Sequence, residues 1–295
     1  TGALNIYADP LLGSEISPTT SPAASSKPAD SDPNYTLNYE EPVMRGRYTQ
    51  DLLKLQTREL VRNVSYFVFV AVFPFFMSGM FLGMTYIMAG KPGGPDFGPI
   101  VMPMAIFLAV TGIGLQVTAG PLAELREAGA LRVLGTTPLS RTDFLLTHLA
   151  VRFIMGIIQI AIIIAIAIGL DLVTASNGVL VFAVSLIGLA LFFTIGYLIG
   201  GVVSSGQLAA NLSTLIQLLA LFLSGAAIPF AILPDSLAAV LSKIPTSLFA
   251  DLIFWAADSP LQRTSNPLLA FAVVIAVTVV LFVVAVRAFK WDVRK

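Results

Sequence analysis

A set of long apolar runs constrains the fold of this chain more than any other feature, and the last run is the clearest. From Pro267 to Phe289 the sequence reads PLLAFAVVIAVTVVLFVVAVRAF, with Arg287 as its only charged residue. A helix needs about 20 apolar residues to cross about 30 Å of hydrocarbon. The runs lack the alternating pattern of an outer-membrane barrel strand. They therefore predict helices that cross a membrane.

Composition supports this interpretation. The 295-residue chain is 56% hydrophobic and 12% charged, whereas soluble domains carry about 25% charged residues. A soluble fold could not bury so much apolar surface, so we expect an all-α polytopic membrane protein. A net charge of zero gives no indication of a nucleic-acid partner, and none is expected. With no cysteine and a single histidine, His148, we expect neither a metal site nor a catalytic site.

Six segments are candidates for membrane spans. Their approximate bounds are Tyr66–Ala89, Gly98–Ala119, Arg152–Leu170, Gly178–Val203, Leu208–Leu233 and Pro267–Phe289. Six spans place both termini on the same side of the membrane. Most Lys and Arg residues lie near the ends that share this side, and only Lys91, Lys243 and Arg263 fall on the other. Because cytoplasmic loops are enriched in basic residues, we expect both termini to be cytoplasmic.

The N-terminal part of the chain divides into two segments. Residues 1–44 are rich in Pro, Ser, Ala and Asp, which predicts a disordered cytoplasmic tail, with a docking or regulatory segment as the alternative. Residues Arg47–Val64 place leucines at helical spacing and charged residues on other faces. This pattern predicts an amphipathic helix in the plane of the membrane surface. The alternative is a helical extension of the first span into the cytosol.

A charged stretch, GPLAELREAGALRVLGTTPLSRTDFLLTHL, separates the second and third apolar runs. Gly120 and Pro121 can start a helix, since proline is tolerated at the first helical position. Gly135 is suited to end it, and Thr137 can cap a following helix that begins at Pro138. The stretch therefore predicts a short cytoplasmic helix over about Pro121–Leu134.

The motif ELREAGALRVLGTTPLSRTDFLL in this stretch resembles the coupling-helix region of ABC-2-type permeases, the membrane subunits of a class of ATP-binding cassette exporters. A second segment, Leu223–Ala256, resembles the part of these permeases between the fifth and sixth spans. Its prolines interrupt the helix, so the chain is expected to dip into the outer surface. Two short re-entrant outer helices, Ser236–Ser242 and Ser247–Ala256, are predicted there. The resemblance assigns residues 45–295 to an ABC-2-type transmembrane domain.

The resemblance implies that ATP hydrolysis and transport are carried out by different subunits. A separate ATPase subunit would bind ATP and Mg, and a second permease subunit, identical or different, would complete the transporter. The chain has no G-x-x-x-x-G-K-[ST] phosphate loop, so we expect it to bind no cofactor and to hydrolyse no ATP by itself. The implied home is a bacterial inner membrane. The residues implied to couple to the ATPase are Glu124, Arg126, Glu127, Gly129, Leu131, Arg132 and Leu134.

Few polar residues lie within the predicted spans. Gln207 and Asn211 share a face of the fifth span, and Phe73 and Phe76 belong to an aromatic-rich first span. We expect these four residues to line a substrate path, although hydrogen bonding between helices is an alternative role for the amides. A nearly uncharged interior favours an apolar or amphipathic cargo, such as a lipid, a drug or a lipid-linked glycan. Arg152, near the start of the third span, is expected to reach the lipid headgroups.

Two other functions compete with an ATP-driven exporter. An ion-coupled secondary transporter usually has carboxylates within the membrane or repeats with broken helices. The predicted spans hold no central Asp or Glu, which disfavours this class. A non-transporting membrane scaffold is the other alternative. Co-purification of an ATPase would distinguish the exporter from both.

Overall fold

The helices of the chain form one bundle. The computed structural model describes residues 54, 57, 64–88, 98–129, 141–228, 230–261 and 266–288. All of them belong to a compact unit, Pro42–Lys295. Every regular element in this part is helical, which confirms the predicted all-α class. The predicted tail 1–44 and nearly all of the predicted helix Arg47–Val64 lie outside the described residues.

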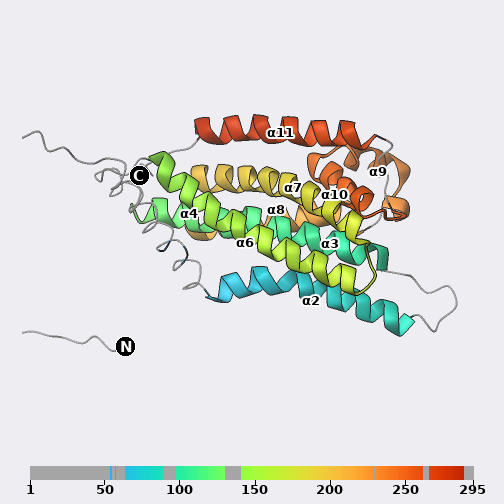
Figure 1. The fold of residues 1–295 in the computed structure, drawn as a ribbon. Coiled ribbons are helices and arrows are strands. Elements are labelled where there is room, and N and C mark those ends of the chain that lie inside the picture. Colours follow the sequence, from blue (N-terminus) through green and yellow to red (C-terminus); the bar gives the residue numbers. More distant parts are fainter. Residues whose placement is uncertain are drawn as a thin grey trace, which may run out of the picture. The chain divides into compact units, whose positions relative to one another are not determined.

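The described elements follow one another along the chain as helices of very different length. They are α2 (Val64–Met88), α3 (Gly98–Thr111), the π-helical turn η1 (Gly112–Gln116), α4 (Val117–Glu127), α6 (Arg141–Gly169), α7 (Ala175–Val202), α8 (Gly206–Leu223), the short turn η2 (Phe230–Ile232), α9 (Asp235–Leu241), α10 (Pro245–Ala256) and α11 (Pro267–Ala288). Figure 1 shows α2, α6, α7 and α11 running in roughly the same direction, with α2 and α11 on opposite sides and α9 and α10 gathered at one end. α7 packs against both α4 and α11, and α8 packs mainly against α4.

Several of these helices can cross a membrane. Five segments are long and apolar enough: Gly98–Glu127, Thr147–Gly169, Ala175–Val202, Gly206–Leu223 and Pro267–Ala288. α2 contains a shorter apolar stretch, Val70–Met84, and α9 and α10 meet at a bend of 93°. The fifth span was predicted to reach Leu233, but α8 ends at Leu223 because Gly225 adopts a positive φ of 83° and turns the chain. The chain is a multi-pass membrane protein.

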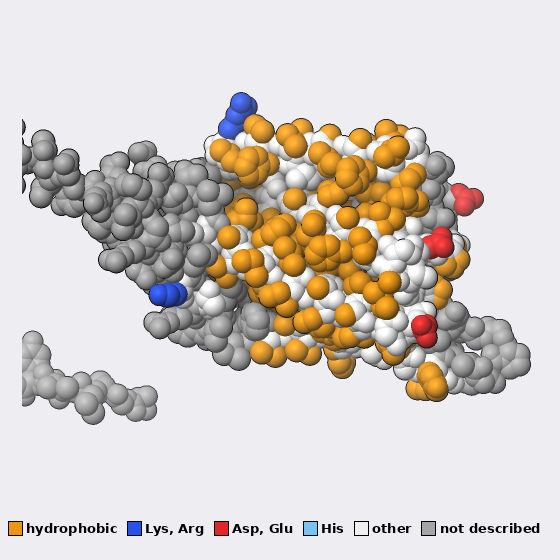
Figure 2. Space-filling view, viewed as in Figure 1, with side chains coloured by type: hydrophobic (Ala, Val, Ile, Leu, Met, Phe, Trp, Pro, Cys, Tyr) orange, Lys and Arg blue, Asp and Glu red, His pale blue; other side chains and the backbone are white. Residues whose placement is uncertain are grey.

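The surface of the bundle suits contact with lipid. Figure 2 shows hydrophobic side chains spread over the middle of one face, with acidic side chains towards one end. Large apolar side chains such as Leu268, Phe282 and Ile158 are more than half exposed. Soluble monomers rarely expose so continuous an apolar surface. The exposed leucines and isoleucines therefore mark the sides of the bundle that face hydrocarbon.

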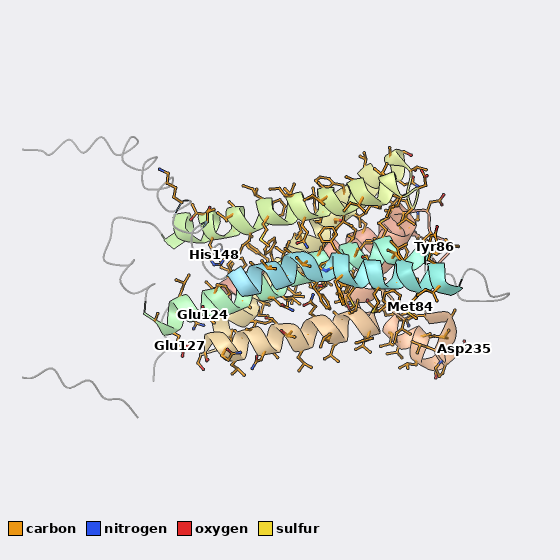
Figure 3. All side chains as sticks on the ribbon, turned by 90° about the horizontal axis from the view of Figure 1, so that it is seen from below. Met84, Tyr86, Glu124, Glu127, His148 and Asp235 are labelled. Carbon is orange, nitrogen blue, oxygen red and sulfur yellow. The ribbon has the colours of Figure 1, made fainter. Side chains whose placement is uncertain are left out.

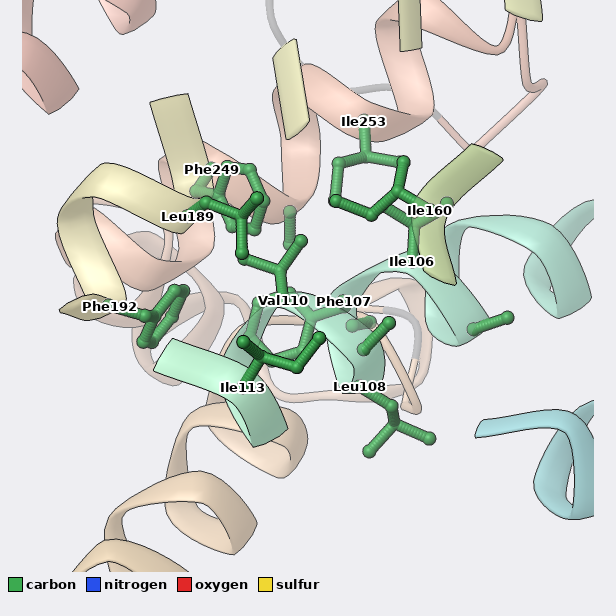
Figure 4. Packing of buried hydrophobic residues seen from close by; sticks show 14 of the residues in the cluster. Ile106, Phe107, Leu108, Val110, Ile113, Ile160, Leu189, Phe192, Phe249 and Ile253 are labelled. Carbon is green, nitrogen blue, oxygen red and sulfur yellow. The ribbon is translucent and has the colours of Figure 1, made fainter. Parts of the chain in front are cut away.

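The core is organised around α3, which is buried along nearly its whole length. Three aromatic rings meet there: Phe107 on α3, Phe192 on α7 and Phe249 on α10 lie with ring centroids 5.9 Å apart in each pair. Figure 4 shows this cluster among aliphatic neighbours. Gly188 permits the arrangement, because a Cβ added there would lie 2.0 Å from the Phe249 ring. The rings thereby join α3, α7 and the outer helix α10.

Candidate functional site

The helix that carries the charged stretch starts and ends at other residues than the sequence predicted. Pro121 lies inside α4 instead of starting a helix, since α3, η1 and α4 follow one another without a break from Gly98 to Glu127. The helix also ends earlier than Gly135. Ala128 is the last capping residue, and Gly129 adopts a positive φ of 69° that ends the helix there. The predicted start at Pro121 is therefore wrong, and α4 does not continue to Leu134. Gly135, the predicted stop, lies with the rest of residues 130–140 outside the described part.

Glycines bring this end of α4 against α7 and α8. A Cβ added at Gly200 on α7 would lie 2.8 Å from the carbonyl oxygen of Ala119. A Cβ added at Gly206 on α8 would lie 2.1 Å from Cγ of Glu124. The helices approach so closely that no larger side chain fits without a shift in the neighbouring atoms. The end of α4 is therefore in close contact with both α7 and α8.

Arg126 joins α4 to the end of α7. Its side chain is only 4% exposed, and Nη1 donates hydrogen bonds to the carbonyl oxygens of Gly200 at 2.8 Å and Val203 at 3.0 Å. The last carbonyls of a helix have no partner within it, and a cation there also interacts favourably with the helix dipole. Arg126 thus caps the C-terminus of α7.

Glu127 joins α4 to the start of α8. Its carboxylate accepts a hydrogen bond from the backbone N–H of Gly206 at 3.0 Å. The capping residue Ser205 makes no side-chain capping bond among the described contacts, so Glu127 supplies the acceptor that the first turn of α8 needs. An anion at this position is also favoured by the dipole of α8. Two adjacent residues of α4 therefore hold both sides of the α7–α8 turn.

Glu124 faces the exterior at the same end of the bundle. Its side chain is exposed, and Figure 3 shows Glu124 and Glu127 at the end opposite Asp235 of α9. Of the residues predicted to couple to an ATPase, Glu124, Arg126, Glu127 and Gly129 therefore lie together at the end of α4. Leu131, Arg132 and Leu134 lie outside the described residues.

A buried polar group on α6 contacts α4 one to three turns before its charged end. Arg152 on α6 is fully buried, and its Nε donates to the carbonyl oxygen of Val117 at 2.8 Å. Its Nη1 lies 3.2 Å from the carbonyl oxygen of His148, and the His148 ring hydrogen bonds to the Tyr197 hydroxyl at 2.9 Å. The prediction that Arg152 reaches the headgroups is wrong, because its fork of donors meets carbonyls inside the bundle. No partner for Arg152 is apparent in the sequence around it, so this contact was not predicted.

A second polar cluster lies deeper in the bundle, at the π-helical turn. Nε2 of Gln116 donates to Oε1 of Gln217 on α8, and Nε2 of Gln217 donates to Oγ1 of Thr111 at 3.1 Å and to the carbonyl oxygen of Leu108 at 3.4 Å. All three side chains are buried. Gln217 therefore joins α8 to α3 by interhelical hydrogen bonds, the role expected of amides that do not line a path.

The residues predicted to line a substrate path project from two different helices. Gln207 and Asn211 are exposed on α8, where Nε2 of Gln207 donates to Oδ1 of Asn211 at 2.9 Å. Phe76 on α2 is 62% exposed, whereas Phe73 is partly buried against the core. Within the described residues, no group of three or more His, Cys, Asp or Glu side chains could hold a metal ion.

Comparison with known protein families supports the resemblance. The family model described as ABC-2 family transporter protein matches residues 48–287, which include the charged end of α4 and all the described spans. No curated protein matches the chain significantly. The match extends over most of the sequence and confirms the resemblance found in the motifs.

Proposed function

Because the chain belongs to the ABC-2 transporter family, we propose that it is the transmembrane permease subunit of an ATP-driven exporter. Membership of this family implies a partner ATPase subunit. In this proposal ATP and Mg are bound by that partner, and the permease supplies no catalytic residue. A second permease subunit, identical or different, completes the transporter.

The attachment of α4 to the α7–α8 turn is the observation that carries the proposal. Arg126 binds carbonyls at the end of α7, and Glu127 binds the first N–H of α8. A force on the end of α4 would therefore reach two spans at once. α7 packs in turn against α10 and α11, so the displacement would extend through the bundle. An ATPase that binds the end of α4 could shift the bundle between two states in this way.

The side of the membrane follows from charge. In this proposal the end of α4 and both termini are cytoplasmic, because most basic residues lie near the ends of the predicted spans on that side. The exposed Glu124 would then contact the ATPase, with Leu131, Arg132 and Leu134 continuing the contact. A bacterial inner membrane is the location that we propose for the complex.

The opposite end of the bundle would lie at the outer surface. α9 and α10 are separated by a 93° bend, and Oγ of Ser247 donates to the carbonyl oxygen of Leu223 at 3.1 Å. This bond attaches the start of α10 to the end of α8. We assign α9 and α10 as re-entrant outer helices, because α10 is buried on most of its length and packs into the core through Phe249.

The cargo that suits this surface is amphipathic. Gln207 and Asn211 lie in the first two turns of α8, close to the proposed cytoplasmic surface, and their amides are exposed. In the assembled transporter these amides would meet a polar group of the cargo or of the second subunit. The surrounding surface is apolar, so a lipid, a drug or a lipid-linked glycan is the favoured class of cargo.

Co-purification tests the proposal. The full chain, extracted in mild detergent, should carry an ATP-hydrolysing subunit in fixed stoichiometry. The rate of ATP hydrolysis by that subunit should differ between the isolated subunit and its complex with the wild-type chain. It should not differ when Glu124, Arg126 and Glu127 of the chain are all replaced by Ala. A chain that purifies without an ATPase and supports transport driven by an ion gradient would contradict the proposal.

A further inference from the structure

The prolines inside the described helices share an unusual arrangement. Pro74 lies inside α2, Pro103 inside α3 and Pro121 inside α4. A proline has no N–H, so the carbonyl four residues before it loses its helical hydrogen bond. Away from water, such a carbonyl must find another donor.

A side chain from another element supplies that donor in each case. For Pro74, Nε2 of Gln159 on α6 lies 3.3 Å from the carbonyl oxygen of Val70 and also 3.0 Å from that of Ala71. For Pro103, Oγ of Ser259, just beyond α10, lies 3.4 Å from the carbonyl oxygen of Pro99.

For Pro121 the donor is a charged group. Nε of Arg152 lies 2.8 Å from the carbonyl oxygen of Val117, and this is the shortest of the three contacts. Arg152 and Gln159 are seven residues apart and so share one face of α6. The same face of α6 therefore supports α2 at Pro74 and α4 at Pro121.

Pro121 lies just before the charged end of α4, so the contact between Arg152 and Val117 affects where that end lies. Pro121 precedes Arg126 and Glu127, the residues that bind α7 and α8. A proline weakens a helix at one point and allows it to bend there. A bend at Pro121 would change where the charged end of α4 lies.

Arginine has the properties that holding such a bend requires. Its guanidinium remains charged at any physiological pH and presents a fixed fork of donors. In Arg152 one donor reaches Val117 on α4 and another reaches His148 on α6 itself. The fork thus fixes α4 relative to α6 in both position and direction. Placing a charge in the interior is costly, which indicates that this contact does more than fill space.

We propose that Pro121 is a hinge in α4 and that Arg152 is the positioning residue that fixes its angle. Through the hinge, Arg152 sets the place at which the end of α4 is presented to the ATPase. The significance for transport rests on the proposed function, but the hinge itself is a property of this chain.

Spin labels can measure the hinge directly, because the chain contains no cysteine. Cysteines introduced at Ala128, just beyond α4, and at Leu170, just beyond α6, occupy exposed positions. Distances between labels would be measured by double electron–electron resonance on the full chain in lipid nanodiscs. Arg152→Met should broaden the distance distribution, since α4 then loses its attachment to α6 at Pro121 and is held only at its end, by Arg126 and Glu127.

Pro121→Ala should reverse this effect, because alanine restores the N–H that bonds the Val117 carbonyl within the helix. An unchanged width in Arg152→Met, or no narrowing when Pro121→Ala is added, would overturn the proposal. If Arg152→Met does not fold, the variant that also carries Pro121→Ala is expected to fold, and failure of both would equally overturn it.

Gln159→Met is the matched control, since it removes the donor at Pro74 from the same face of α6. It should leave the width of the distribution unchanged, and equal broadening would show a general loosening of α6 and overturn the proposal. The measurement needs no ATPase. A negative result would therefore reject the hinge without contradicting the proposed transport function. A missing ATPase partner would reject the proposed function without contradicting the hinge.

Discussion

At the scale of single residues, the decisive contacts are side chains that satisfy backbone groups at helix ends and breaks. Arg126 and Glu127 cap neighbouring helix termini, and Arg152 bonds a carbonyl freed by a proline. In a dry interior each unsatisfied group costs a few kcal/mol, a large part of the margin by which a fold is stable. Residues that look like surface charges in the sequence can therefore be structural.

Arg126→Met should destabilise the chain and uncouple it. The substitution removes the donors for the Gly200 and Val203 carbonyls, and loss of a charged hydrogen bond to buried groups costs about 1–3 kcal/mol. Thermal unfolding in detergent should show a lower Tm than wild type, and the partner ATPase should lose its response to the permease. A Tm equal to that of wild type would contradict the capping role.

Glu124→Gln should separate coupling from stability. Glu124 is exposed, so the variant should keep the wild-type Tm while weakening the effect of the permease on ATP hydrolysis. The measurement pairs an unfolding curve with an ATPase assay on the same preparation. Wild-type values in both assays would show that Glu124 takes no part in coupling.

These contacts show what the sequence could and could not predict at this scale. The preference of proline for the first helical position predicts a helix start at Pro121, but α4 continues through this residue. The proline is tolerated inside α4 because Arg152, which is distant in sequence, satisfies the freed carbonyl. Local patterns do not contain such a partner, so the boundary was misplaced.

At the scale of helices, packing depends on positions where no side chain fits. Gly188 of α7 lies against the ring of Phe249, and Gly200 and Gly206 allow α4 to approach α7 and α8. Small residues have this role in membrane proteins, where close approach of backbones drives association. The spans themselves were predictable from apolar length, whereas these crossing points depend on the tertiary arrangement.

Gly188→Ala should destabilise the bundle by about 1–3 kcal/mol through overpacking. The added methyl would overlap the Phe249 ring, and adding Phe249→Leu should recover part of the loss because the smaller side chain leaves room. Gly83→Ala on α2 is the control, since a Cβ there meets nothing within 4 Å. Equal Tm values for Gly188→Ala and Gly83→Ala would contradict this packing.

The amides at the π-helical turn should behave as a unit. Gln217→Leu removes the acceptor of the Gln116 amide and the donor to the Thr111 hydroxyl, so it should lower the Tm. In the double variant Gln116→Leu/Gln217→Leu, the total loss of stability should be smaller than the sum of the losses in the two single variants. Strict additivity in a double-mutant cycle would show that the two amides stabilise the bundle independently.

At the scale of the whole molecule, the bundle presents different chemistry at its two ends. One end carries the charged terminus of α4, and the other carries the bent pair α9 and α10. The family and the multi-pass architecture were predictable from sequence, since both rest on apolar length and motif order. The inward course of α10 depends on the Phe249 contacts, which only the folded chain reveals.

Site-specific photocrosslinking tests the central claim, that an ATPase holds the charged end of α4. The cysteine-free chain allows a benzophenone to be attached through Glu124→Cys, with Asp235→Cys at the opposite end as the control. In native membranes, the label at Glu124 should give an adduct with a protein that mass spectrometry identifies as carrying an ATP-binding cassette, and the label at Asp235 should not. No such adduct from Glu124, or an equal yield from Asp235, would contradict the account.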